Sequence, residues 1–153
     1  MNLRSKIDED YKQSIKNKDQ NKTNTLRLIK SAIKDKDISS RSAENKEGIN
    51  DSQILSLLIT LIKQRKDSIE QFQKAKRDDL IKNEQSEIDI INIYLPQQKS
   101  EEETESIVSD LIKNNNMVSI KDMGKLMSII KNDFAGEVDM GLVGKIAKSK
   151  LGN

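Results

Sequence analysis

Two glutamates, Glu84 and Glu87, lie one helical turn apart in a segment with helical periodicity, and Asp78 and Asp79 precede them. Paired carboxylates of this kind can act as a general acid and base. A structural interpretation is stronger, because acidic side chains are also favoured near the N-terminus of a helix and on its solvated face. No His, Cys or glycine-rich loop accompanies the pair, so we predict no catalytic residue here.

The segment Gly141-Leu142-Val143-Gly144-Lys145 resembles a phosphate-binding loop only in part. A P-loop has four residues between its glycines and a Ser or Thr after the Lys, whereas here Ile146 follows. The same Gly-x-x-Gly spacing matches the backbone clamp of KH domains, which also needs a sheet. We favour the simpler interpretation that two small residues allow helices to pack closely.

Arg65 falls within the apolar stripe of a predicted long helix, near Leu58 and Phe72. A guanidinium in that position needs a partner or a ligand, because an unpaired charge is costly to bury. We favour an ion pair with a carboxylate of the following helix, for which Glu84 and Glu87 are the candidates. A bound ligand is the alternative.

The composition excludes several classes of function. The 153 residues include no Cys and no His, which rules out disulfides, thiol nucleophiles and the commonest ligands of transition metals. Any metal would be a hard cation bound by oxygen atoms, and we predict neither a metal site nor a cofactor. With no Trp, two Tyr and two Phe, an aromatic platform for stacking several bases is not expected.

The apolar pattern predicts an all-α protein with a thin core. Leu3, Ile7, Tyr11 and Ile15 recur every fourth residue on one face of a first helix. A second helix carries Arg27, Lys30 and Lys34 on its exposed side. Its buried side carries Leu26, Ile29, Ala32 and Ile33. The polar segment 39–50 is predicted to be a loop, and Asp51 to cap a third, long helix.

The only proline, Pro96, predicts the boundary between two parts. The residue before a proline disfavours the α conformation, so a fourth helix should end near Tyr94-Leu95-Pro96. We therefore predict an N-terminal helical domain, 1–95, and a C-terminal three-helix domain, 96–153. In the second part Ser100 with Glu103 forms a capping box, and Asp139 and Gly152 bound the last helix.

Several short segments together resemble the GatB/YqeY family, and in particular its stand-alone YqeY-like members. The matches occur in the order of the family and extend over nearly the full length. They are Leu26-Arg27-Leu28-Ile29-Lys30-Ser31-Ala32-Ile33, Lys63-Gln64-Arg65, Arg77-Asp78-Asp79-Leu80, Glu84 with Glu87, Tyr94-Leu95-Pro96 and Asp122-Met123-Gly124-Lys125.

The resemblance implies an all-helical fold and a link to translation. In this family the region forms the tail of the B subunit of the tRNA-dependent amidotransferase, where it helps to hold the tRNA. A similar module is attached to some glutaminyl-tRNA synthetases. The family label, a carbon–nitrogen ligase with glutamine as amido donor, describes that complex. The chain itself has no Cys and no Ser–Lys amidase signature, so we do not transfer the activity to it.

Two functions follow as hypotheses. The first is a non-catalytic module that binds structured RNA, most plausibly tRNA, by shape and phosphate contacts. The candidate RNA-binding residues are Lys121, Lys125, Lys145 and Lys148 in the C-terminal part, with Arg27, Lys30 and Arg77 in the N-terminal part. The C-terminal part has eight basic and nine acidic side chains, so the acids Glu101 to Glu103 must face away from the RNA.

The second hypothesis is a protein-interaction subunit that joins amidotransferase or aminoacyl-tRNA synthetase subunits. Met123, Met127 and Met140 could offer an adaptable apolar surface for it, although we favour ordinary core positions for these methionines. The longest apolar run is three residues, Leu57-Leu58-Ile59, so no membrane span is expected. Because the charged N-terminus also lacks a signal-peptide apolar region, we predict a cytoplasmic location.

Overall fold

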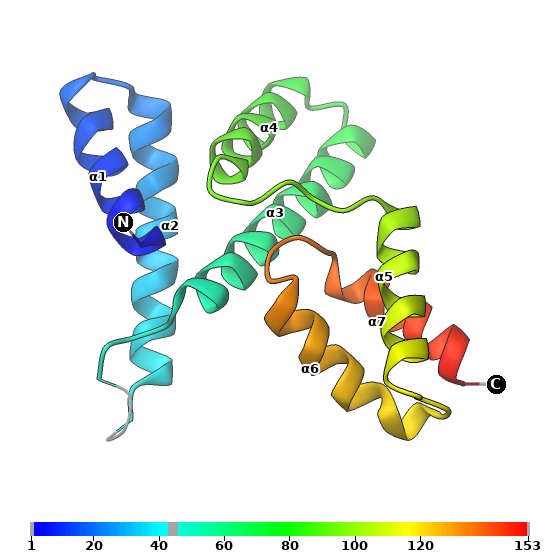
Figure 1. The fold of residues 1–153 in the computed structure, drawn as a ribbon. Helices are drawn as coiled ribbons and strands as arrows, with labels where there is room; N and C mark the ends of the chain where they lie inside the picture. The colour runs from blue at the N-terminus through cyan, green and yellow to red at the C-terminus, as the bar shows by residue number, and fades with distance from the viewer. Residues whose placement is uncertain (1, 43–45, 153) are drawn as a thin grey trace. The chain divides into compact units, whose positions relative to one another are not determined.

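The computed structural model describes residues 2–42 and 46–152, which form seven α-helices, one short 3₁₀ helix and no strand (Figure 1). The prediction of an all-α protein is confirmed. In chain order the elements are α1 (Leu3–Lys16), α2 (Gln20–Ser40), α3 (Asp51–Lys74), α4 (Asp78–Asn92), α5 (Glu101–Asn114), η1 (Ile120–Asp122), α6 (Met123–Asp133) and α7 (Met140–Leu151). No helix in these described ranges has both the length and the apolar character needed to cross a bilayer.

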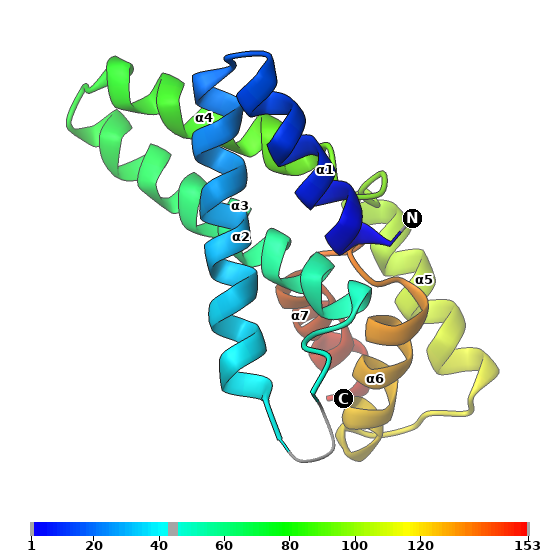
Figure 2. The same ribbon diagram turned by 90° about the vertical axis from the view of Figure 1, so that its left-hand side faces the viewer.

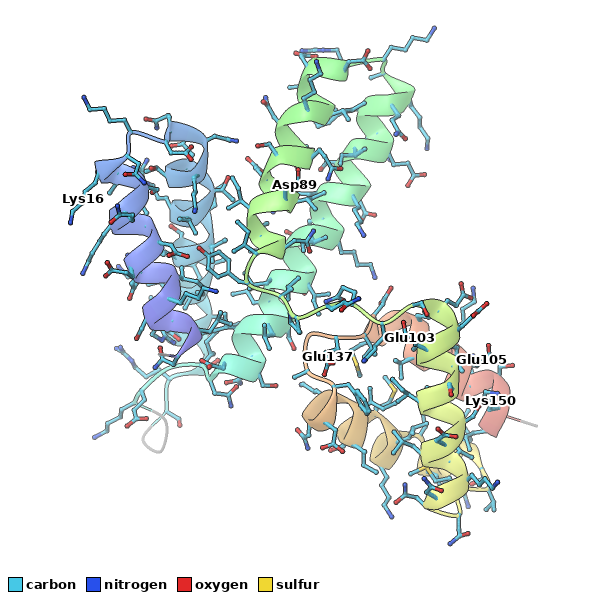
Figure 3. All side chains as sticks on the ribbon, turned by 45° about the horizontal axis from the view of Figure 1, so that its top comes forward. Lys16, Asp89, Glu103, Glu105, Glu137 and Lys150 are labelled. Atoms are coloured by element: carbon cyan, nitrogen blue, oxygen red, sulfur yellow. The ribbon has the colours of Figure 1, made fainter. Side chains whose placement is uncertain are left out.

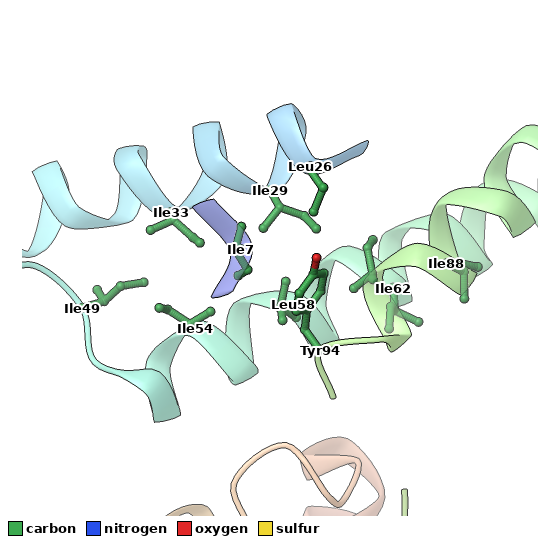
Figure 4. Close-up of a cluster of buried hydrophobic side chains, with 11 residues drawn as sticks. Ile7, Leu26, Ile29, Ile33, Ile49, Ile54, Leu58, Ile62, Ile88 and Tyr94 are labelled. Carbon is green, nitrogen blue, oxygen red and sulfur yellow. The ribbon is translucent and has the colours of Figure 1, made fainter. Parts of the chain in front are cut away.

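The chain divides into two compact units, Met1–Leu95 and Pro96–Asn153. The N-terminal unit holds α1 to α4 and has its own hydrophobic core, in which α1 packs on α2 and α3 packs on α4 (Figure 4). Tyr94 lies beside Leu58 within this core (Figure 4). Its buried members are Ile7, Leu26, Ile29, Ile33, Ile49, Ile54, Leu58, Ile62, Ile88, Ile91 and Tyr94.

The C-terminal unit has a separate, smaller core made by α5, α6 and α7. Its methionines are part of this packing: Met117 is buried, and Met123, Met127 and Met140 are half-buried against the core. The other buried members are Val108, Leu126, Ile130, Val138, Val143, Ala147 and Leu151. The methionines at 123, 127 and 140 therefore fill the interior and do not form an open contact surface.

Side-chain caps fix where most of the helices begin. The predicted capping box is present: Glu103 N–H donates to Ser100 Oγ, and Ser100 N–H donates to the Glu103 carboxylate (Figure 3). Asp139 accepts from two backbone N–H groups of α7, as predicted. The prediction that Asp51 caps α3 is wrong. Asn50 is the cap, with an extended backbone and a reciprocal bond to Gln53, and Asp51 is the first helical residue.

Three helices end on a residue in the left-handed conformation that usually favours glycine. These residues are Lys18 after α1, Lys76 after α3 and Asn116 after α5, with φ of 55°, 56° and 53°. In each case the next N–H donates back across the last turn, as Arg77 N–H does to Phe72 O at 2.9 Å. Gly152 directly follows α7, as predicted, and has a right-handed φ of −79°.

Two further expectations differ from the structure. Ile15 was expected on the buried face of α1, but it is 51% exposed, whereas the neighbouring Ser14 is buried and accepts a hydrogen bond from Thr23 of α2. The predicted loop 39–50 is shorter at its start, since Ser39 and Ser40 belong to α2. Residues 43–45 of that loop lie outside the described residues.

An arginine–carboxylate clasp holds the start of α1, the end of α2 and the segment before α3 together. The two terminal nitrogens of Arg4 donate to the two oxygens of Asp37 at 2.8 and 2.9 Å, and Nη2 also donates to Ile49 O at 3.0 Å. Ile49 N–H donates to Asp37 Oδ1 at 2.8 Å. Gly48, with φ of +91°, approaches Asp37 so closely that a Cβ atom would collide with the carboxylate.

A second long-range bond ties α1 to the segment before Pro96. The hydroxyl of Tyr94 donates to Asp10 Oδ2 at 2.6 Å, and Lys6 Nζ lies 5.6 Å from the centre of the Tyr94 ring. Burial of the phenol, together with the adjacent Asp10 carboxylate, raises the pKa of Tyr94 well above its usual range. The hydroxyl therefore stays protonated and remains a donor at physiological pH.

Candidate functional site

A surface depression lies between α1 and α2, which run side by side in the N-terminal unit (Figure 2). Its volume is about 460 Å³. It lies along the line of contact between the two helices, where side chains spaced three or four residues apart on each helix form one face. We call it the α1–α2 groove. It is lined by Arg4, Ile7, Asp8 and Tyr11 of α1 and by Arg27, Lys30, Ser31, Ile33, Lys34 and Asp37 of α2.

The lining is cationic, with four basic side chains and two carboxylates. The two carboxylates are already paired: Asp37 with Arg4, and Asp8 with Lys30 at 3.2 Å. Arg27 and Lys34 are exposed, and no carboxylate of the described chain lies within 4.0 Å of either. These two cations are therefore available to an anionic ligand.

Tyr11 lies in the middle of the groove. Lys30 Nζ is 4.5 Å from the centre of its ring, which is a cation–π distance. Arg27 Nε donates to the Tyr11 hydroxyl at 3.5 Å, a long bond. The ring therefore separates the paired cation Lys30 from the available cation Arg27, and its apolar body packs partly on the core.

A second depression of about 470 Å³ adjoins the groove near the α1–α2 turn. Arg27 lines both depressions. We call this one the Lys18 depression. Its other lining residues are Ile15, Lys18, Gln20 and Thr23.

Sequence reasoning found part of this site. Arg27 and Lys30 were among the candidate RNA-binding residues, and the i, i+3, i+7 spacing also placed Lys34 on their face of the helix. Tyr11 was assigned only to the core face, and Arg4 and Lys18 were not singled out. The sequence around Tyr11, Arg4 and Lys18 does not indicate a site, because these residues come close to the cations of α2 only when α1 packs against α2.

The candidate lysines of the C-terminal unit are all exposed. Lys121 lies in η1, Lys125 in α6, and Lys145 and Lys148 in α7. No carboxylate of residues 96–152 lies within 4.0 Å of these four amines. In this unit η1 and α6 both pack on α7, so the four lysines come from elements that touch one another.

The acidic side chains of the C-terminal unit are concentrated elsewhere. Glu101, Glu102 and Glu103 occupy the first turn of α5, whereas η1 and α6 follow its other end. A 14-residue helix is about 21 Å long, so this helix separates the acids from Lys121 and Lys125. Two other acids are matched by lysines: Glu105 by Lys150 at 3.6 Å and Glu137 by Lys99 at 3.8 Å (Figure 3).

Asp122 is the acid nearest to these lysines, and its role is structural. Its carboxylate accepts from Val118 N–H at 2.9 Å and Ser119 N–H at 3.3 Å, which fixes the turn before α6. These backbone donors, and to a lesser extent the charge of Lys125, lower the pKa of Asp122. The carboxylate therefore stays ionised and holds Lys121 in a rigid turn.

Arg77, the remaining RNA-binding candidate, lies in the turn between α3 and α4. It is exposed and donates to both oxygens of Asp79, at 3.2 and 3.1 Å. A ligand would have to compete with that carboxylate, so Arg77 contributes less free positive charge than Arg27 or Lys34. The structure brings Arg27 and Lys30 together in one groove and places Arg77 outside it.

Arg65 is paired with Glu87 inside the α3–α4 packing. Its Nε donates to Glu87 Oε2 at 2.7 Å, and Nη1 donates to Leu61 O at 3.0 Å. The arginine side chain is 13% exposed and that of Glu87 26%. Glu84 lies one turn earlier on α4. Burial, followed by repulsion from Glu87, raises the pKa of Glu84, and Arg65 opposes this shift.

We expect Glu84→Gln to stabilise the protein at pH 7. A carboxyl whose pKa is raised in the folded state penalises folding above that pKa and favours it below, because the folded state binds the proton more tightly. The gain should therefore vanish near pH 3.5, where Glu84 is protonated in both states. Urea unfolding at the two pH values measures it, with the exposed Glu9→Gln as control. A stabilisation that is equal at both pH values would contradict this explanation.

The chain matches the protein family described as "Yqey-like protein" over residues 4–151. The chain belongs to this family. The resemblance to GatB/YqeY proteins inferred from the short segments is thereby confirmed, and the YqeY-like match extends over both units.

Curated YqeY-like relatives come from yeasts and carry the name "Altered inheritance of mitochondria protein 41, mitochondrial". The chain is 38% identical to the Lachancea thermotolerans protein over 125 residues, which cover 78% of this chain and 65% of that protein. It is 39% identical to a Saccharomyces cerevisiae protein, over 58% of this chain and 45% of that protein. The chain thus spans between about half and two thirds of these relatives.

The prediction of a cytoplasmic location is wrong by this comparison, because the relatives are named as mitochondrial proteins. The prediction rested on the absence of a signal-peptide apolar region and of a membrane span. These features do not separate the cytoplasm from an organelle, because mitochondrial targeting segments are amphipathic and lack a long apolar run.

Proposed function

We propose that the chain is a non-catalytic accessory module that binds structured RNA, in the first place tRNA, through its backbone phosphates. The observation that carries the proposal is that exposed cations without a carboxylate partner gather on neighbouring elements within each unit. In the N-terminal unit Arg27 and Lys34 line the α1–α2 groove. In the C-terminal unit Lys121, Lys125, Lys145 and Lys148 lie on η1, α6 and α7, and both η1 and α6 contact α7.

The distribution of charge supports this reading better than the total charge does. The formal net charge is only +2, so non-specific attraction to a polyanion is weak. Pairing and burial neutralise many acids locally, as for Asp8, Asp37 and Glu87, whereas the six cations named above stay open to solvent. An RNA of suitable shape can contact such cations, and its folded backbone then supplies the selectivity.

We expect the double variant Lys125→Glu with Lys145→Glu to bind bulk tRNA at least about tenfold more weakly than the wild type at low salt. Each lost phosphate contact should also reduce the slope of log affinity against log salt by about one. Fluorescence anisotropy across a salt series measures both quantities, with bulk tRNA and mitochondrial tRNA as ligands.

The matched control is Lys63→Glu with Lys82→Glu, which changes the net charge equally at exposed positions of α3 and α4. It should retain most of the affinity. If both double variants lose the same affinity for tRNA, the change in net charge alone explains the loss. Unchanged tRNA affinity in both variants would refute the RNA-binding proposal.

A second candidate function is a protein-interaction subunit that joins amidotransferase or aminoacyl-tRNA synthetase subunits. One observation favours it: Val118 and Ile120, in the turn before α6, are 82% and 49% exposed. Exposed apolar side chains on a rigid turn suit a protein contact. A pull-down that recovers such subunits after ribonuclease treatment, and loses them in Val118→Ser with Ile120→Ser, would favour this candidate over RNA binding.

A further inference from the structure

The α1–α2 groove and the Lys18 depression differ from a simple phosphate-binding surface in their size. Each has a volume of about 460 to 470 Å³, within the range of roughly 300–1,000 Å³ typical of small-ligand sites. A lysine that contacts the phosphates of a duplex needs no such depression. Both hollows are therefore large enough to take a ligand group.

The groove also has an apolar floor beneath its cationic rim. Ile7 and Ile33 lie at its base but are almost completely buried, at 1% and 4% exposure, so the accessible apolar face is mainly the half-buried ring of Tyr11, which contacts Lys30 and Arg27. The backbone of a regular RNA duplex presents phosphates and ribose but keeps the base faces stacked inside. An unpaired nucleotide offers both parts at once: an apolar base face and a phosphate.

We propose that the α1–α2 groove binds unpaired nucleotides, with a base over the floor beside Tyr11 and a phosphate at Arg27. Two lining charges remain uncompensated when Arg4–Asp37 and Lys30–Asp8 are counted as pairs, namely those of Arg27 and Lys34. This matches the anionic charge of one or two phosphates. The inference deepens the proposed RNA-binding function, because it names the part of the RNA that this site takes.

Arg27 lines both the α1–α2 groove and the Lys18 depression, so the two could bind two successive nucleotides. Because Arg27 lines both depressions, a phosphate at its guanidinium would connect one nucleoside in the groove with the next in the Lys18 depression. The exposed side chains of Ile15 and Lys18 give the second depression the same pairing of an apolar surface with a cation. The site would thus select loops or single strands over duplexes.

This arrangement is compatible with the scarcity of aromatic residues in the chain. Platforms that stack many bases use a series of aromatic rings. The groove offers a single ring, Tyr11, supported by aliphatic side chains. Pockets that take one unstacked base commonly combine aromatic and apolar side chains in this way. The site is therefore suited to one or two nucleotides and not to a long single strand.

The test compares a fluorescein-labelled single-stranded RNA hexamer with a blunt duplex of the same sequence, by anisotropy at low salt, using the full chain. We expect tighter binding of the single strand. Tyr11→Ala should weaken single-strand binding by about tenfold and leave duplex binding unchanged. Tyr11→Phe should bind as the wild type does, and Arg27→Ala should weaken single-strand binding more than the exposed control Lys12→Ala.

Tyr11 also packs on the core, so a second measurement avoids dependence on the stability of the variant. A hexamer that carries 4-thiouridine should crosslink to α1 and α2 of the wild-type protein, as mapped by mass spectrometry. Competition by adenosine monophosphate at equal affinity would identify a free nucleotide as the source of the ligand.

Crosslinks confined to other elements, or equal affinity for single strand and duplex, would overturn the inference. If tRNA binding still depends on Lys125 and Lys145 in that case, the proposed function stands and only the groove assignment fails. If adenosine monophosphate binds in the groove while neither RNA nor tRNA binds, the groove assignment stands and the proposed function fails.

Discussion

Replacing Asp37 with alanine is expected to lower the free energy of unfolding of the N-terminal unit by about 3 kcal/mol at pH 7. The carboxylate accepts two bonds from Arg4 and one from Ile49 N–H, and its side chain is 22% exposed. The substitution leaves the Arg4 guanidinium and a backbone donor without this partner. Urea unfolding followed by circular dichroism measures the loss.

The pH dependence of this loss provides a check. Arg4, through its hydrogen bonds, lowers the pKa of Asp37 below its usual range in the folded protein. A lowered pKa means that the stabilisation is complete above the unfolded-state value near 3.9 and is lost as the pH falls through the folded-state value. The stabilities of the wild type and Asp37→Ala should therefore approach each other as the pH falls through the folded-state pKa of Asp37.

Asp35→Ala is the matched control, since Asp35 is an exposed aspartate on the same helix. It should change the unfolding midpoint little. A loss for Asp37→Ala below about 1 kcal/mol, or one that persists unchanged in acid, would show that the clasp is not a stabilising element.

The second large effect concerns the Arg65–Glu87 pair. Glu87→Ala should cost about 3 kcal/mol, because it leaves a guanidinium with 13% exposure facing the space where its carboxylate was. The double variant Arg65→Met with Glu87→Leu should recover most of that loss, since apolar side chains of similar volume remove both charges together. Measuring the single variants Arg65→Met and Glu87→Leu in the same way completes the double-mutant cycle and gives the coupling energy.

Asp79→Ala, which breaks the fully exposed pair with Arg77, serves as the comparison and should leave the unfolding midpoint unchanged. A Glu87→Ala variant as stable as this control would mean that water reaches Arg65 freely. A double variant that is no more stable than Glu87→Ala would indicate a role of Arg65 in packing and not in charge pairing.

Features that depend on neighbouring residues could be predicted from the sequence. The Ser100–Glu103 capping box and the Asp139 cap follow from side chains within three residues of the groups they bind. The end of the fourth helix before Pro96 follows from a steric rule on adjacent residues. The helical stripe of Ile54, Leu58 and Ile62 follows from spacing alone, and all three are buried.

Features that depend on tertiary packing could not be predicted. The spacing that placed Ile7 correctly also placed Ile15 on the buried face, but in the last turn of α1 it is Ser14 that packs against Thr23 of α2. The choice between Asn50 and Asp51 as cap depended on one residue of register, which a pattern cannot resolve. Tyr11 became part of the candidate site only because α2 brings Arg27 and Lys30 to its ring.

The hydrogen bond from Tyr94 to Asp10 has a consequence for the order of folding. Helices that follow one another in sequence pack together in this unit, α1 on α2 and α3 on α4, so each hairpin can form through local contacts within microseconds to milliseconds. The Tyr94–Asp10 bond instead spans 84 residues and requires both hairpins to be in place. We expect it to form after the transition state, so that Tyr94→Phe accelerates unfolding and leaves the folding rate unchanged.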